Sequence, residues 1–108
     1  MLKLAEKKCV PCEGGTKPLG FFEVSEFRKQ LSKTWEITGN KLMKHKFKFS
    51  EYRKAVEFVD KVAALAIEQD HHPQIELFYD MVVIKLTTHA IGGLSENDFI
   101  MASKIEQI

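Results

Sequence analysis

The sequence of 108 residues has few cysteines, few prolines and no long apolar run. Its longest uninterrupted apolar stretch, residues 62–67, is far too short to cross a bilayer. The N-terminus lacks an apolar core of the secretory kind, so we expect a cytoplasmic protein without a membrane segment. A formal net charge of +1, with no basic run among aromatics, gives no reason to expect nucleic acid as a partner. Length and composition predict one soluble globular domain over residues 1–108.

The two cysteines, Cys9 and Cys12, form a lone C-x-x-C. A structural zinc site usually needs four ligands, and a redox pair normally lies between a strand and a helix. This pair lies instead in a stretch punctuated by proline and glycine, which predicts an irregular N-terminal arm over residues 1–20. We interpret the cysteines as two reduced thiols in a loop, with metal or disulfide chemistry between molecules as the alternative.

A hairpin is predicted in the second half of the chain. Residues 74–79 and 81–88 both alternate apolar with polar side chains, a period of two that is typical of half-buried strands. Only residues 80 and 81 lie between the apolar positions of the two runs, which predicts a tight turn there.

Pairing Tyr79 with Val82 sets the register of this hairpin. Glu76 then lies opposite Lys85, and because cross-strand pairs of opposite charge are favourable, that pair supports the register. Tyr79 continues the apolar face of its strand, so we expect its ring to pack in the core.

Three of the four histidines converge at the open end of the predicted hairpin. The register places His72 opposite His89, and His71 should lie beside them where the chain leaves the preceding helix. Because imidazole has an unperturbed pKa near neutral pH, three converging histidines indicate proton transfer or metal binding. The fourth, His45, lies on an apolar strand face and is expected to be a packed or interface histidine.

A second hairpin is predicted earlier in the chain, after a short helix around residues 24–31. Residues 35–38 suggest a short strand, and Gly39 with Asn40 suggests a turn. Residues 41–49 then alternate strictly, which predicts a strand with one apolar face and one solvated face rich in lysine.

Two further helices complete the expected order. Ser50 offers an N-cap to one long amphipathic helix, which must cover a sheet and end before Pro73. Ser95, with Asp98 three positions later, offers a capping arrangement to a terminal helix. Helix, two strands, helix, two strands and helix predict an α+β fold: a four-stranded antiparallel sheet with helices packed on one face, in two layers.

The spacing of these residues resembles that of a known family. His71-His72-Pro73 is followed by Tyr79, His89 and Asp98 after five, nine and eight intervening residues. This pattern is similar to that of the pterin-4a-carbinolamine dehydratases, and matched positions at matched spacings are more specific than one short motif. Further matches, which extend the resemblance to bacterial members over essentially the whole chain, are residues 9–15, Trp35, residues 47–49 and residues 88–94.

The resemblance implies the fold reached above and an activity without metal or organic cofactor. That activity is dehydration of a 4a-hydroxytetrahydropterin to the quinonoid dihydropterin, in recycling of a tetrahydrobiopterin-type cofactor. It also implies a homodimer or homotetramer. Animal members bind a homeodomain transcription factor in addition, a role that these motifs do not carry over.

The resemblance also implies roles for individual residues. By position, His71 and His89 would be the acid–base pair, and His72 would complete the catalytic histidines and help to hold the pterin. General acid–base groups contribute about 10²–10⁴-fold each, and histidine suits neutral pH. The further candidates for binding the pterin are Asp98, Thr88 and Glu68.

One position departs from the family pattern. Ile67 stands where the family usually has an acidic residue, and Glu68 could replace that residue only if the helix end shifts. This departure predicts a reduced rate or a different pterin. Helix capping alone would also explain Asp98.

Two hypotheses from other classes stay open. The converging histidines and a carboxylate could form a zinc site. The chain could also be a non-catalytic pterin-binding or scaffold protein that acts through its oligomer interface.

Overall fold

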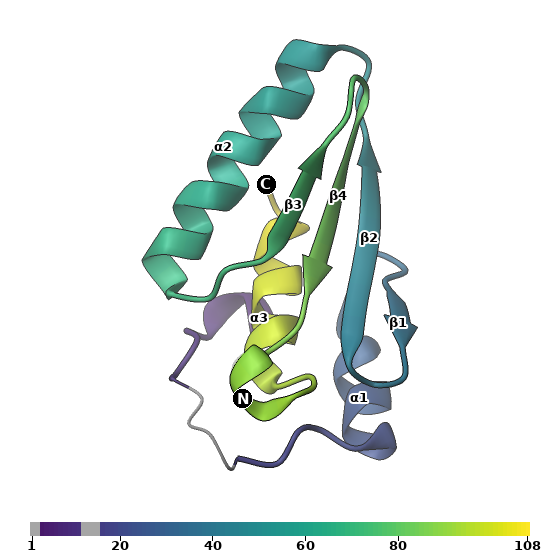
Figure 1. Ribbon diagram of the computed structural model, residues 1–108, viewed down its shortest axis with the longest axis vertical. Coiled ribbons are helices and arrows are strands. Elements are labelled where there is room, and N and C mark those ends of the chain that lie inside the picture. Colours follow the sequence, from purple (N-terminus) through teal and green to yellow (C-terminus); the bar gives the residue numbers. More distant parts are fainter. Residues whose placement is uncertain (1–2, 12–15) are drawn as a thin grey trace.

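A computed structural model describes residues 3–11 and 16–108 and shows the expected α+β architecture (Figure 1). Helices alternate with pairs of strands in the predicted order, and the helices pack on one face of the sheet. The elements in chain order are α1 (Phe21–Arg28), β1 (Glu36–Thr38), β2 (Leu42–Lys48), α2 (Tyr52–Gln69), β3 (Gln74–Leu77), β4 (Met81–Leu86) and α3 (Glu96–Ile105). Two 3-10 helices, Leu4–Glu6 and His89–Ile91, precede α1 and follow β4.

The sheet is antiparallel throughout, in the order β1-β2-β4-β3. Its inner face packs against the helices around fully buried side chains such as Trp35, Ile84 and Phe99. The alternation of the strands produces this burial, because every second side chain points to the same face. The outer face carries charged side chains, among them Lys85, whose Nζ lies 3.2 Å from a carboxylate oxygen of Glu76.

The register of the β3–β4 hairpin differs from the prediction. Val82 pairs with Leu77 and not with Tyr79, which lies in the turn. Each partner is displaced by two positions, and because side chains alternate with a period of two, the side chains of the paired residues keep their predicted faces. Glu76 reaches Lys85 diagonally instead of directly across the pair.

The prediction that Tyr79 packs in the core is wrong. The residue is 77% exposed and lies in the turn between β3 and β4, at the opposite end of β3 from His71 and His72. There its ring stacks on Tyr52, with centroids 6.4 Å apart and planes 15° from parallel. The residue belongs to the turn, and so its side chain no longer follows the alternation of the strand.

The beginning of α2 also differs from the prediction. The N-cap position is Glu51 and not Ser50, and no side-chain hydrogen bond caps this end of the helix. The short helix expected around residues 24–31 begins and ends three residues earlier, as α1. The turn signal at Gly39 and Asn40 is confirmed. Gly39 and Asn40 both have positive φ, 58° and 56°, as a tight hairpin turn between β1 and β2 requires.

The N-terminal arm is less irregular than expected. Leu4 lies in a turn of 3-10 helix and is only 2% exposed, so its side chain belongs to the core. Cys9 is half-buried, and Cys12 lies outside the described residues, which leaves the interpretation of the cysteine pair as a prediction. In the described part of the chain, no helix has the length and apolar character that a membrane span needs.

Candidate functional site

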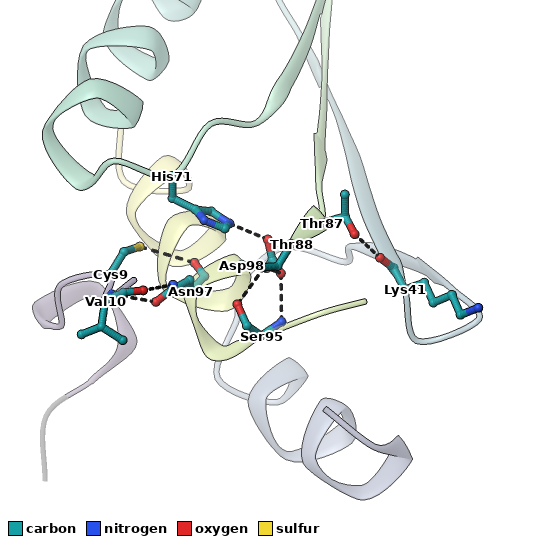
Figure 2. A network of polar contacts seen from close by, with 9 residues as sticks. All are labelled: Cys9, Val10, Lys41, His71, Thr87, Thr88, Ser95, Asn97 and Asp98. Carbon is teal, nitrogen blue, oxygen red and sulfur yellow. Dashed lines mark hydrogen bonds and ion pairs between the residues drawn. The ribbon is translucent and has the colours of Figure 1, made fainter. Parts of the chain in front are cut away.

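The end of α2 directs His71 toward α3. The helix closes with Asp70 in the left-handed conformation, φ 52° and ψ 41°. This conformation lets the N–H of His71 donate back to the carbonyl of Ala66 at 3.2 Å, a helix-ending arrangement that turns the chain sharply. The side chain of His71 is only 12% exposed and lies against the first turn of α3 (Figure 2).

Asp98 is the buried partner of His71. Its Oδ1 lies 2.7 Å from Nε2 of His71, and the carboxylate is fully buried. Its Oδ2 accepts hydrogen bonds from the Thr88 hydroxyl at 2.7 Å and from the backbone N–H of Ser95 at 3.0 Å (Figure 2). The Ser95 contact is the predicted capping arrangement, in which a carboxylate at the third helical position bonds to the N-cap backbone.

The hydrogen bonds around Asp98 fix the tautomer of His71. Because a carboxylate only accepts hydrogen bonds, the proton in the 2.7 Å contact belongs to Nε2 of His71. In the neutral imidazole, Nδ1 then carries the lone pair that can take a proton. The hydroxyl of Thr88 is also 2.8 Å from that of Ser95. The two residues that hydrogen-bond to Oδ2 of Asp98, one on each side of the loop before α3, therefore also contact each other.

A cleft of about 410 Å³ lies beside this pair. It brings together the ends of α2 and β4, the first turn of α3 and part of the N-terminal arm. Its lining residues are Val10, Pro11, Asp70, His71, His72, Thr87, Thr88, His89, Ala90 and Asn97.

The predicted convergence of the three histidines is therefore found, although the β3–β4 ladder ends at Gln74 and Lys85, before His72 and His89. His72 is 68% exposed, with its Nε2 3.9 Å from a carboxylate oxygen of Asp70. His89 is exposed in the 3-10 helix that follows β4.

The remaining candidates differ in position. Thr88 lines the cleft, but it is 6% exposed and its hydroxyl contacts Asp98. Glu68 is exposed, does not line the cleft and accepts a hydrogen bond from Gln69 at 3.3 Å. Ile67, on the same turn of α2, is 75% exposed.

His45 lies outside the cleft, as expected for a packed histidine. It is half-buried on β2, its ring centroid is 4.8 Å from that of Phe47, and its Nδ1 lies 3.0 Å from the carbonyl oxygen of Thr34. Within residues 3–11 and 16–108, no three His, Cys, Asp or Glu side chains are grouped so that they could hold a metal ion.

Sequence reasoning missed the contribution of the arm to the cleft. Val10 and Pro11 line it, and Asn97 holds Val10 through both of its backbone polar groups. The sequence gives little sign of this contact, because Asn97 is only one more polar residue in the first turn of a helix.

These features define a class of protein: a small α+β domain with a cleft in which a buried carboxylate orients one of three histidines. The sequence matches the family described as pterin 4 alpha carbinolamine dehydratase over residues 18–108. A protein of Nitrosomonas eutropha is 43% identical over 105 residues, which are 97% of this chain and 92% of that protein. A protein of Rubrobacter xylanophilus is 41% identical over the whole of both chains, 108 residues. Both carry the name "Putative pterin-4-alpha-carbinolamine dehydratase". The chain belongs to this family.

Two solved structures are similar to the fold. A crystal structure described as a transcriptional coactivator/pterin dehydratase from Brucella melitensis has a TM-score of 0.78 at 30% identity, covering 85% of this chain and 97% of that chain. A pterin dehydratase-like protein, described as a RuBisCO assembly factor in the alpha-carboxysome, has a TM-score of 0.61 at 26% identity, covering 70% and 89%. The descriptions of these two proteins thus include roles other than dehydration.

Proposed function

We propose that this protein dehydrates 4a-hydroxytetrahydropterins by histidine acid–base catalysis. The observation that carries the proposal is the 2.7 Å contact between His71 and buried Asp98, at a cleft that His72 and His89 also line. In the reaction, the bond between C4a and its hydroxyl breaks and water leaves. One proton goes to the departing hydroxyl oxygen and one comes from a ring nitrogen, which yields the quinonoid dihydropterin.

We assign the base to His71 and the acid to His89. Asp98 accepts a hydrogen bond from the Nε2–H of His71, so the neutral imidazole keeps a lone pair at Nδ1, and its cation would be stabilised by the adjacent carboxylate. His89 is exposed and therefore able to exchange its proton with water between turnovers. Each group is expected to contribute about 10²–10⁴-fold to the rate.

The other candidates take supporting roles in this proposal. His72, exposed at the cleft, would hold the pterin, while Thr88 would act through its hydrogen bond to Asp98. Glu68 would reach a pterin only if the last turn of α2 rearranged. The same proposal has the protein working in the cytoplasm as a homo-oligomer, in recycling of a tetrahydrobiopterin-type cofactor and without a cofactor of its own.

The test is the dehydration rate of freshly generated 4a-hydroxytetrahydropterin, followed by ultraviolet absorbance. Reactions without protein are compared with wild type, His71→Ala and His89→Ala, and His45→Ala serves as the matched control because it is a histidine outside the cleft. We expect a large acceleration that is lost in the first two variants and kept in the third. Folded wild-type protein that gives only the uncatalysed rate would refute the proposal.

A second candidate is a pterin-binding or scaffold protein without catalysis. Ile67 favours it, because an exposed apolar side chain stands where the resemblance calls for an acid. The neighbour described as an assembly factor is consistent with it. Wild-type protein that binds an oxidised pterin in calorimetry, forms a stable oligomer and leaves the dehydration rate unchanged would support this candidate over the enzyme.

A further inference from the structure

The N-terminal arm precedes the segment that matches the family model, and it reaches the cleft. The family match begins at residue 18, whereas Val10 and Pro11 line the cleft together with the three histidines. Both arm residues are exposed, and Val10 is 65% exposed.

Buried amide side chains fasten the arm at this place. Asn97 is 4% exposed; its Oδ1 accepts the N–H of Val10 at 3.0 Å and its Nδ2 donates to the Val10 carbonyl (Figure 2). Gln69 is 8% exposed, and its Oε1 accepts the N–H of Cys9 at 2.9 Å. Two successive arm residues, Cys9 and Val10, are thus held through their backbone, and Sγ of Cys9 adds a contact of 3.7 Å with the carbonyl oxygen of Asn97.

The two amides also stand next to the residues that form the proton-transfer pair. Asn97 directly precedes Asp98, and Gln69 is two residues before His71. The arm is therefore fixed to the same ends of α2 and α3 that fix the imidazole and the carboxylate. The same two helix ends, those of α2 and α3, therefore set the distance between the arm and His71.

We propose that Val10 and Pro11 form a wall of the pterin site, and that Asn97 and Gln69 are the positioning residues that hold this wall. The inference rests on the proposed function and adds a determinant of substrate binding to it. Apart from Ala90, the remaining lining residues are polar and supply imidazoles, hydroxyls, an amide and a carboxylate. Val10 and Pro11 instead offer an apolar surface, and Pro11 has no N–H to leave unsatisfied. Such a surface suits one side of a flat bicyclic ring whose polar atoms are turned to the histidines.

The charge of the lining narrows the substrate class. The described residues of the cleft include the exposed carboxylate of Asp70 and neither lysine nor arginine. An anionic substituent on the ring would meet no lysine or arginine side chain among these described residues. The site should therefore favour pterins whose substituents carry no negative charge.

The experiment adds bulk to the wall without touching the groups that transfer protons. Pro11→Trp is compared with Lys8→Trp, a matched change at an exposed arm residue that does not line the cleft. We expect Pro11→Trp to raise KM by about tenfold while kcat stays within about twofold, because binding is hindered and the acid–base pair is intact. Lys8→Trp should leave both constants unchanged.

A second pair of variants tests the positioning residues. Asn97→Ala and Gln69→Ala should each raise KM with a smaller effect on kcat, and the double variant should approach the KM of Pro11→Trp. Equal KM values for Pro11→Trp, Lys8→Trp and wild type would overturn the proposal that Val10 and Pro11 form a wall of the site. If wild type itself shows no dehydration, the proposed function fails, and the wall is then judged by calorimetric Kd values for oxidised pterin. Equal Kd values for the two tryptophan variants would overturn it on that measurement as well.

Discussion

Replacing Asp98 by asparagine separates the two functions of this carboxylate. Asparagine has nearly the same shape, and its one oxygen can take over the Oδ2 contacts with Thr88 and with the N–H of Ser95. Its NH₂ group then faces Nε2 of His71, where a donor already points. The imidazole has to move its proton to Nδ1, and the lone pair that would receive the substrate proton is lost.

The expected magnitude follows from the hydrogen bond that is lost. A hydrogen bond to a charged group contributes about 1.5–3 kcal/mol, and each 1.36 kcal/mol in the barrier changes a rate about tenfold. We therefore expect kcat of Asp98→Asn to fall by about 10–150-fold, with a smaller change in KM. Stopped-flow ultraviolet absorbance gives both constants, and circular dichroism checks that the variant is folded at the assay temperature.

The control for this prediction removes a different carboxylate from the same turn of α3. Glu96→Gln breaks an ion pair with Lys7 and does not touch His71, so it should leave kcat near the wild-type value. The reasoning about the tautomer is refuted if folded Asp98→Asn keeps kcat within about threefold of wild type, a factor too small for a lost charge-assisted hydrogen bond.

Three further predictions concern stability, followed by the fluorescence of the one tryptophan during urea unfolding. Gly93→Ala should lower the free energy of unfolding by about 1–3 kcal/mol, since its Cβ would lie 2.7 Å from Cβ of Pro18; superimposable curves would contradict this. Glu106→Gln should lower the free energy of unfolding by about 1–3 kcal/mol, because an NH₂ group replaces an oxygen that accepts hydrogen bonds, such as Oε2, which accepts from the indole N–H of Trp35 at 2.8 Å. An unchanged midpoint would contradict this. Asp70→Gly should raise stability by about 0.5–1 kcal/mol by relieving the left-handed conformation, and a fall would contradict that reasoning.

The strand faces could be predicted from the sequence, whereas the register of the hairpin could not. Alternation fixes which side chains point inward, and a displacement of two positions preserves that assignment. The predicted register depends on the pairing of Glu76 with Lys85. This ion pair can form directly across the strands or, as in the structure, diagonally, so it does not distinguish the two registers. The turn had to decide, and Tyr79 fits an exposed turn because its ring stacks on Tyr52.

The convergence of the histidines survives this error because it depends on topology more than on register. His71 is placed by the end of α2, and His89 by the end of β4. The end of α2 leads into the start of β3, and β4 ends beside that start. Both therefore lie at the open end of the hairpin, whichever residue occupies its turn. The place of the arm, by contrast, depends on single hydrogen bonds between residues far apart in the sequence, and the arm has no periodicity that could reveal them.

For Asp98, capping the helix and contacting His71 are compatible. A carboxylate at the third position of a helix must come close to the N-cap backbone, and here one of its oxygens does so at 3.0 Å. The geometry that satisfies the helix leaves the other oxygen with a fixed direction, and His71 lies in that direction at 2.7 Å. The first turn of α3 therefore fixes the orientation of the His71 imidazole. Substitutions that loosen this helix end should reduce the reaction rate even where they touch no substrate.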